Sequence, residues 1–211
     1  MHLVVKKSIV IGERMFGKKD ILIVCGLEQE TVGELEDWNV LYTGVGKVNA
    51  TFKLTQKLQI NRSLPPMPEL VINYGTAGSR KSPIGELVDC TKFIQRDMDV
   101  TGLGFMKHQT PYESPNEMVI RCTSKFNPIG KNYTCGTGDS FVENIKRGDS
   151  NIDVFDMEAY ALAKVCYHYD INFISFKYIT DNVDEHSPRD WEDNLCGGIV
   201  EFKEKVLTKI K

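Results

Sequence analysis

The chain has 211 residues, of which 41% are hydrophobic and 26% charged, and its formal net charge is −3. This length predicts one domain that spans residues 1–211 and buries a substantial core. The small acidic excess and the absence of long basic clusters argue against a nucleic-acid or anionic-membrane partner, and no apolar run approaches the roughly 20 residues that a membrane span needs.

Cysteine and histidine usage indicates neither a disulfide framework nor a metal site. The six cysteines are widely spaced without a C-x-x-C pair, and we interpret them as reduced thiols. The four histidines lie in polar surroundings, so neither a zinc site nor a Ser-His-Asp arrangement can be assembled from them. Residues 1–7 carry a basic pair without a following secretory apolar segment, which predicts a cytoplasmic protein. The net charge of −3 without a basic cluster favours a small-molecule ligand.

Strands and helices alternate along the first half of the chain. The apolar run Ile21–Cys25 predicts a strand that is buried on both faces and ends at Gly26. Apolar residues at helical spacing predict a helix over residues 48–60, and residues 70–73 predict the next buried strand. Further strands are predicted over residues 86–94, 118–122 and 133–135, with Gly136 and Gly138 breaking the last.

The second half continues this order. A helix is predicted over residues 157–169, a β-rich strand over 172–179 and one closing amphipathic helix over 191–210. Strands separated by helices predict an α/β fold. We expect a three-layer sandwich, in which a mixed, largely parallel central sheet is flanked by helices.

Carboxylates follow the last predicted strand. The stretch 176–185 runs from β-branched and aromatic residues into a group of acids that includes Asp181. Open α/β sheets bind ligands at the carboxyl ends of their strands, so Asp181 is a candidate to hold or donate a proton. The alternative is that Asp181 caps the helix that follows this loop.

Several glycine-containing segments follow predicted strands or open a helix, and we expect them at one edge of the sheet. They are Gly26-Leu-Glu-Gln-Glu30, Thr43-Gly-Val-Gly-Lys47, Tyr74-Gly-Thr-Ala-Gly78 and Gly136-Thr-Gly-Asp-Ser-Phe141. Glycine lets backbone amides approach a ligand, and the amides of Gly44 and Gly46 at a helix start favour an oxyanion. Each segment taken alone is better explained by a tight turn, and the second lacks the spacing of a P-loop.

Two acids flank Met157 at the start of a predicted helix. First-turn acids compensate the helix dipole, which accounts for one of Asp156 and Glu158. A glutamate at this place can also accept two hydroxyls of a sugar, because a carboxylate accepts bidentate hydrogen bonds.

Taken in order, these segments resemble the methylthioadenosine/S-adenosylhomocysteine nucleosidases of the purine nucleoside phosphorylase superfamily. The similarity is nearly full-length and is carried by Gly26-Leu-Glu-Gln-Glu30, Thr43-Gly-Val-Gly-Lys-Val48, Asn73-Tyr-Gly-Thr-Ala-Gly78, Asp99-Val-Thr101, Gly138-Asp-Ser-Phe141, Asp156-Met-Glu158 and Ile179-Thr-Asp181.

The resemblance implies an enzyme that hydrolyses the N-glycosidic bond of an adenine nucleoside, such as 5′-methylthioadenosine or S-adenosylhomocysteine, without a metal or organic cofactor. It makes Asp181 the acid that serves adenine N7 and Glu30 the residue that positions the attacking water. The other implied substrate contacts are Leu27, Thr76 near the water, Gly78, Phe141 and Val142 at the purine, and Met157 and Glu158 at the ribose. It also implies a homodimer, in which Val100 and Leu103 reach into the neighbouring subunit's pocket.

These residue types suit that chemistry. Adenine is a poor leaving group as an anion, so cleavage needs proton donation to the ring. Carboxylates stabilise the oxocarbenium-like ribose, and a glutamate can orient and deprotonate water.

The chain also departs from the family pattern. The segment between Glu30 and Leu41 is short, which predicts a more open pocket for the 5′ substituent. Lys177 stands where an arginine is common, while Leu27 and Leu103 replace a methionine and a phenylalanine. The two leucines are still apolar, so a thioether substituent remains compatible.

Two other functions stay open. A phosphorylase of the same fold would need a cation for phosphate, yet Asn73 and Tyr74 occupy the position where such enzymes carry an arginine. A non-catalytic nucleoside-binding protein would not require both Asp181 and Glu30.

Overall fold

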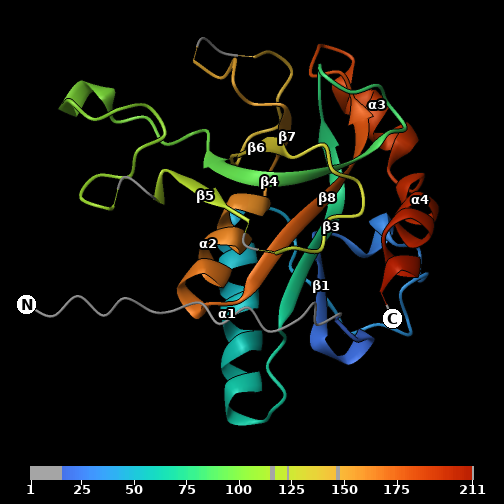
Figure 1. The fold of residues 1–211 in the computed structure, drawn as a ribbon. Coiled ribbons are helices and arrows are strands. Elements are labelled where there is room, and N and C mark those ends of the chain that lie inside the picture. The colour runs from blue at the N-terminus through green and yellow to red at the C-terminus, as the bar shows by residue number, and fades with distance from the viewer. Residues whose placement is uncertain (1–15, 115–116, 123, 146–147, 211) are drawn as a thin grey trace, which may run out of the picture.

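The computed structural model describes residues 16–114, 117–122, 124–145 and 148–210 (Figure 1). Residues 1–15, on which the expectation of a cytoplasmic location rests and which include His2, lie outside these ranges. Within the described ranges, none of the helices combines the length and the apolar composition needed to cross a membrane.

The described residues form one sheet of eight strands with helices on its faces. The strands are β1 (Ile21–Cys25), β2 (Val40–Tyr42), β3 (Leu70–Gly78), β4 (Leu87–Gln95), β5 (Val119–Arg121), β6 (Tyr133–Thr137), β7 (Val154–Asp156) and β8 (Asn172–Asp181). The α-helices are α1 (Lys47–Ser63), α2 (Ala159–Tyr169), α3 (Ser187–Asn194) and α4 (Gly198–Lys205). Short 3₁₀ turns are η1 (Lys18–Asp20), η2 (Glu28–Glu30), η3 (Thr101–Leu103) and η5 (Leu207–Lys209).

The sheet is mixed and largely parallel, as predicted. Parallel pairs join β1 to β2 and β3, β3 to β8, and β6 to β4 and β7. Antiparallel pairs join β4 to β5 and β8, and β3 to β7. The short strands β2 and β7 were not predicted, because three residues carry no readable periodicity.

The expected three-layer sandwich is corrected by the closure of this sheet. Strand β8 pairs with both β3 and β4, and the chain of pairs continues through β6 and β7 back to β3. Five strands therefore form a closed, barrel-like ring, while β2, β1 and β5 extend from it. Strand twist brings the ends of long strands round toward one another, and apolar patterns do not report which strands then meet.

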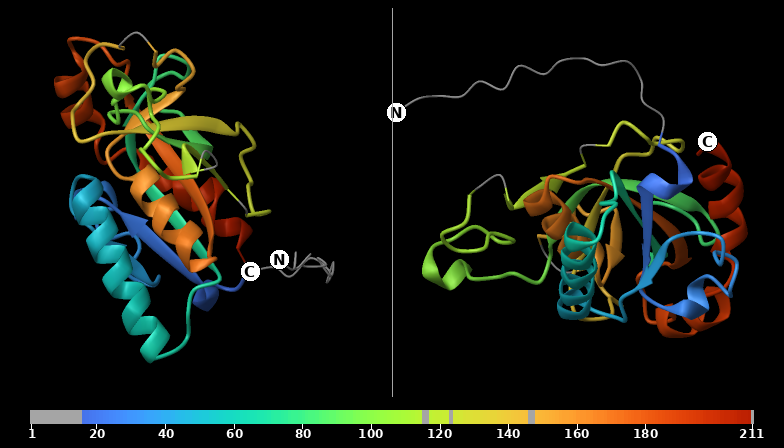
Figure 2. Two further views of the ribbon diagram at one scale, coloured as in Figure 1. Left: turned by 90° about the vertical axis from the view of Figure 1, so that its left-hand side faces the viewer. Right: turned by 90° about the horizontal axis from the view of Figure 1, so that it is seen from below.

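Two apolar cores cover opposite faces of the sheet, as alternation along a strand requires. Leu22 and Val24 face the core that contains the buried side of α1 and α2, whereas Ile21, Ile23 and Cys25 face the core of α4 and η5. Figure 2 shows α1 and α2 lying side by side on one face, with the C-terminal helices on the other.

The strands near the predicted glycine segments are longer than expected. Residues 74–78 belong to β3, not to a loop, and β6 continues through Gly136 to Thr137. Strand β8 likewise reaches Asp181 itself. Glycine is needed inside these strands because other groups approach the backbone so closely that a side chain would clash. A Cβ on Gly78 would lie 2.4 Å from Asp181 Oδ1.

The single closing helix over residues 191–210 is wrong. The chain forms α3, α4 and η5, with the break at residues 195–197. Gly197 and Gly198 pass so close to Tyr178 that a Cβ on them would lie 2.7 and 2.3 Å from its side chain. Contact with β8 thus sets the break, while Ile199 and Phe202 of the predicted stripe are buried and Val200 is exposed.

Candidate active site

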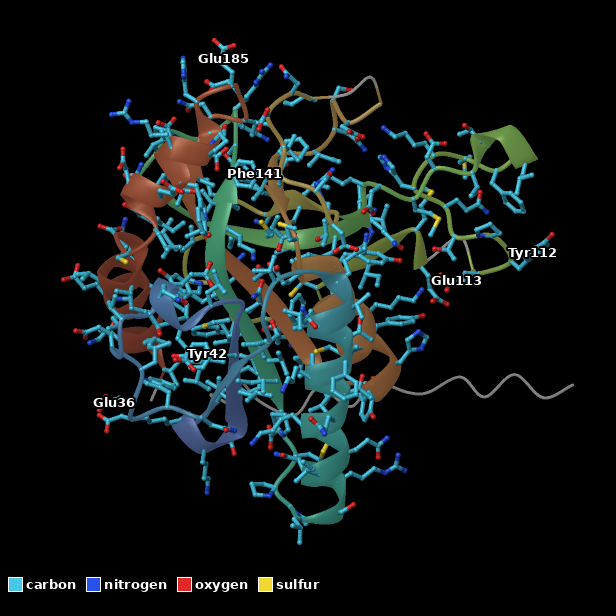
Figure 3. The ribbon with its side chains drawn as sticks, turned by 180° about the vertical axis from the view of Figure 1, so that it is seen from behind. Glu36, Tyr42, Tyr112, Glu113, Phe141 and Glu185 are labelled. Atoms are coloured by element: carbon cyan, nitrogen blue, oxygen red, sulfur yellow. The ribbon has the colours of Figure 1, made fainter. Side chains whose placement is uncertain are left out.

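A cavity of about 270 Å³ lies at the carboxyl ends of β1, β3, β6 and β8, where the sequence predicts a site. It is lined by Gly26, Leu27, Glu30, Val45, Thr76, Ala77, Gly78, Ser140, Phe141, Val142, Phe155, Asp156, Met157, Glu158, Asp181 and Trp191. All predicted site residues except Val100 and Leu103 are in this set. In Figure 3 the labelled Phe141 lies beside the end of a long strand, while Tyr112 lies far out on a projecting segment.

Glu30 is held in the cavity by three short contacts. Its Oε1 accepts hydrogen bonds from Thr76 N at 2.7 Å and Thr76 Oγ1 at 2.9 Å. Its Oε2 accepts one from Leu27 N at 3.0 Å, which also closes the first turn of η2. Both oxygens of buried Glu30 thus accept backbone N–H bonds, which fix the orientation of its side chain.

Asp181 is the last residue of β8 and is 3% exposed. Burial raises its pKa above the usual value, which favours a carboxyl group that keeps a proton to donate. Its Oδ1 accepts a bond from Val183 N at 3.0 Å. The alternative that Asp181 caps the next helix is wrong, because α3 begins at Ser187 after His186.

Glu158 lies at the amino end of α2 and lines the same cavity as Asp181. Burial, followed by the charge of Asp156, raises its pKa to about 7, while Lys177 and a hydrogen bond from Gly46 N act in the opposite direction. That bond is 2.9 Å long, so the Gly46 amide, expected to meet a ligand oxyanion, meets a carboxylate of the protein. Gly46 has a φ of 95°, a conformation that glycine adopts without strain.

Asp156, which lines the cavity, forms a buried ion pair with Lys177. The Nζ of Lys177 lies 2.8 Å from Asp156 Oδ2, and Lys177 is 1% exposed. Burial alone would raise the pKa of Asp156, but the charge of Lys177 keeps it below its usual value. Asp156 Oδ2 also accepts a bond from Ala159 N at 2.8 Å, so this pair fixes the start of α2 and with it the place of Glu158.

The loop that carries Phe141 is fastened to the end of β4. The guanidinium of buried Arg96 donates to the carbonyls of Gly138 and Ser140. Asp139 N donates to Asp97 Oδ2 at 2.9 Å, and Lys47 Nζ bridges both acids. Phe141 itself remains 44% exposed at the cavity, as an aromatic surface for a flat ligand requires.

Sequence reasoning missed Trp191. It was placed in the closing helix, but its indole Nε1 donates to Thr76 Oγ1 at 3.0 Å and its ring lines the cavity. Amphipathic spacing shows that a helix has an apolar face; it does not show that part of this face borders a site.

Val100 and Leu103 do not line this cavity. They lie next to and within η3, on the segment that projects from the sheet in Figure 1, and Leu103 is 75% exposed. A single chain therefore leaves both residues away from the other predicted site residues.

Comparison with known proteins identifies the family. The profile of the phosphorylase superfamily matches residues 26–209. A 5′-methylthioadenosine/S-adenosylhomocysteine nucleosidase of Exiguobacterium sp. (strain ATCC BAA-1283 / AT1b) is 32% identical over 189 residues, which cover 82% of this chain and 79% of the relative. The nucleosidase of Marinomonas sp. (strain MWYL1) is 30% identical over 183 residues, covering 78% and 77%. The chain belongs to this nucleosidase family of the phosphorylase superfamily.

Solved structures of two other proteins share the fold. The Helicobacter pylori 5′-methylthioadenosine/S-adenosylhomocysteine nucleosidase superposes with a TM-score of 0.78 at 20% identity, over 92% of this chain and 100% of that one. The futalosine hydrolase of the same organism gives 0.77 at 19% identity, over 90% and 97%. At these identities the superpositions show that the three proteins share a fold.

Proposed function

We propose that this protein hydrolyses the N-glycosidic bond of adenine nucleosides, such as 5′-methylthioadenosine or S-adenosylhomocysteine, to adenine and a ribose derivative. The observation that carries this proposal is the meeting of Asp181, Glu30 and Glu158 around one cavity. The family relatives carry the name of this activity.

Each carboxyl group has a distinct task in the reaction. Asp181, with its raised pKa, donates a proton to N7 of adenine as the bond between the ring and ribose C1′ breaks. Glu158 accepts ribose hydroxyls and its ionised form stabilises the oxocarbenium-like sugar. Glu30 accepts a proton from water while the water oxygen bonds to C1′. Phe141 stacks on the purine, with Val142 at its edge and Met157 at the ribose.

Hydrolysis is favoured over phosphorolysis by the charge of the cavity. Among the described residues that line it, none is lysine, arginine or histidine, whereas a phosphate dianion needs cationic or multiple hydrogen-bond partners. Asn73 donates to Val24 O and accepts from Ser175, and Tyr74 is buried against Phe202. Neither residue lines the cavity.

The test is adenine release from a nucleoside panel with and without phosphate. Purified protein incubated with 5′-methylthioadenosine, S-adenosylhomocysteine or adenosine should release adenine at a rate that is unchanged when phosphate is omitted. The sugar product should carry a free anomeric hydroxyl. Strict dependence on phosphate with a sugar 1-phosphate product would assign a phosphorylase, and absence of free base would assign a binding protein.

We also propose that the protein is a homodimer with shared pockets. Leu103 is exposed on the projecting segment, as a residue that completes the pocket of a second copy would be in one chain. A groove between α1 and α2 offers further apolar surface, with Val48 78% and Phe52 61% exposed. These exposed apolar side chains support an interface with another copy.

Replacing Leu103 by glutamate tests the shared pocket. Sedimentation of the unsubstituted protein should give a dimer, and Leu103→Glu should weaken adenine release without lowering the melting temperature. Lys19→Glu, a charge change on the exposed turn η1 away from both surfaces, is the control. A fully active monomer at assay concentration would contradict the proposal.

Three further features belong to the same proposal. The described strands form one sheet, which supports a single domain over residues 1–211. The reaction needs neither a metal nor an organic cofactor, because proton transfer and charge stabilisation come from side chains. The six cysteines are unpaired, which supports a reducing, cytoplasmic location.

A further inference from the structure

The indole of Trp191 begins a chain of hydrogen bonds that ends on Glu30. Trp191 Nε1 lies 3.0 Å from Thr76 Oγ1, and Thr76 Oγ1 lies 2.9 Å from Glu30 Oε1. Trp191 lies on α3 and Thr76 on β3, 115 residues apart in the chain, so only the docking of α3 creates the contact.

The direction of these bonds follows from the atoms. An indole N–H can only donate, so the Thr76 oxygen accepts from Trp191. The hydroxyl has one proton, and its neighbour Glu30 Oε1 acts as an acceptor, since it also accepts a bond from the Thr76 backbone N–H at 2.7 Å. The hydroxyl proton therefore points to the carboxylate, and the bonds run from Trp191 to Thr76 to Glu30.

This direction leaves defined groups for a water molecule in the cavity. Among the described residues, two donors hold Glu30 Oε1 but only Leu27 N holds Oε2. A carboxylate oxygen accepts about two hydrogen bonds, so Oε2 can accept one more. Because the Thr76 hydroxyl proton is bonded to Glu30 Oε1, Thr76 cannot donate it to the water oxygen. The lone pair of that oxygen therefore stays free to attack C1′ of the ribose.

We propose that Trp191 is a positioning residue of this site: its indole N–H sets the direction of the Thr76 hydroxyl and thereby holds Glu30 Oε1, leaving Oε2 to take the proton of the attacking water. The proposal rests on the hydrolysis proposed above. Trp191 acts through Thr76, so its effect belongs to the chemical step and not to nucleoside binding.

The test is Trp191→Phe, which keeps an aromatic ring at the cavity and removes the N–H. One such hydrogen bond predicts a kcat about 3- to 10-fold lower, with KM within about 2-fold. Trp38→Phe is the matched control, since Trp38 is the other tryptophan of the chain, packs near Lys18 and does not line the cavity. It should leave both constants unchanged.

A double-mutant cycle separates this role from simple packing. In a Thr76→Val background the chain of bonds is already broken, so Trp191→Phe should cause no further loss of kcat. In a Thr76→Ser background the hydroxyl remains, and the full loss should return. Equal losses of kcat in the valine and serine backgrounds would overturn the proposal, as would a loss confined to KM.

A second comparison does not depend on the folding of the Trp191 variant. Thr76→Val leaves Trp191 in place and should lower kcat by at least as much as Trp191→Phe. An unchanged kcat in Thr76→Val would overturn the proposal. If the unsubstituted protein released no adenine from any nucleoside, the proposed function itself would fail, whereas an active protein unaffected by Trp191→Phe would defeat only the positioning role.

Discussion

Replacing Asp181 by asparagine should lower adenine release by at least about 10²-fold, because general acid catalysis is typically worth about 10²- to 10⁴-fold. The amide keeps the size of the carboxyl group and an oxygen that can accept the bond from Val183 N, but it has no acidic proton for N7. The loss should be in kcat, with a melting temperature close to that of the unsubstituted protein.

Asp184→Asn is the matched control for this variant. Asp184 lies in the loop that follows β8 and accepts a bond from His186 N at 2.9 Å, but it does not line the cavity. Its replacement should leave turnover unchanged. A fully active Asp181→Asn protein would remove Asp181 from the proposed mechanism.

Glu30→Gln should also lose most hydrolysis, by about 10²- to 10⁴-fold in kcat, while nucleoside binding survives. The amide can contact water but cannot take its proton. The structure adds a second effect: if the amide oxygen stays on Thr76, the amide NH₂ faces Leu27 N–H. Two facing donors cost about 1–3 kcal/mol of stability, so a lower melting temperature should accompany the loss.

Measurement of kcat, substrate affinity and melting temperature separates these effects. Glu28→Gln is the control, because Glu28 lies in the same turn η2 but is exposed and outside the cavity. Near-normal turnover of Glu30→Gln would move water activation to another carboxylate. Glu158 would then be the first to test, since it faces the same cavity.

The strand predicted from the uniformly apolar run Ile21–Cys25 is confirmed, because both faces of this strand are buried. Every side chain of Ile21–Cys25 is buried, so the run needs no alternation and is recognised by its length. The three residues of β7 contain no such run, and the ring that β7 completes through Gly78 and Phe155 was therefore not predicted.

For the site residues too, the sequence predicted the kinds of groups present but not which groups contact each other. The amides of Gly44 and Gly46 at a helix start were expected to favour a ligand oxyanion, whereas Gly46 N donates to a carboxylate oxygen of the protein. The sequence did not show that this oxygen belongs to Glu158. Lys177 was noticed as a departure from the family pattern, but its burial and its ion pair with Asp156 depend on how β8 packs against α2 and β7.

By itself, the sequence determined the order of the main strands and helices and the acids that could carry the chemistry, since these depend on residues close in the chain. Only the tertiary structure decided that the sheet closes, that Trp191 reaches Thr76 and that Asp181 is buried enough to raise its pKa. Closure, burial and hydrogen-bond direction arise from contacts between distant segments, and local patterns of hydrophobicity and charge do not encode those distances.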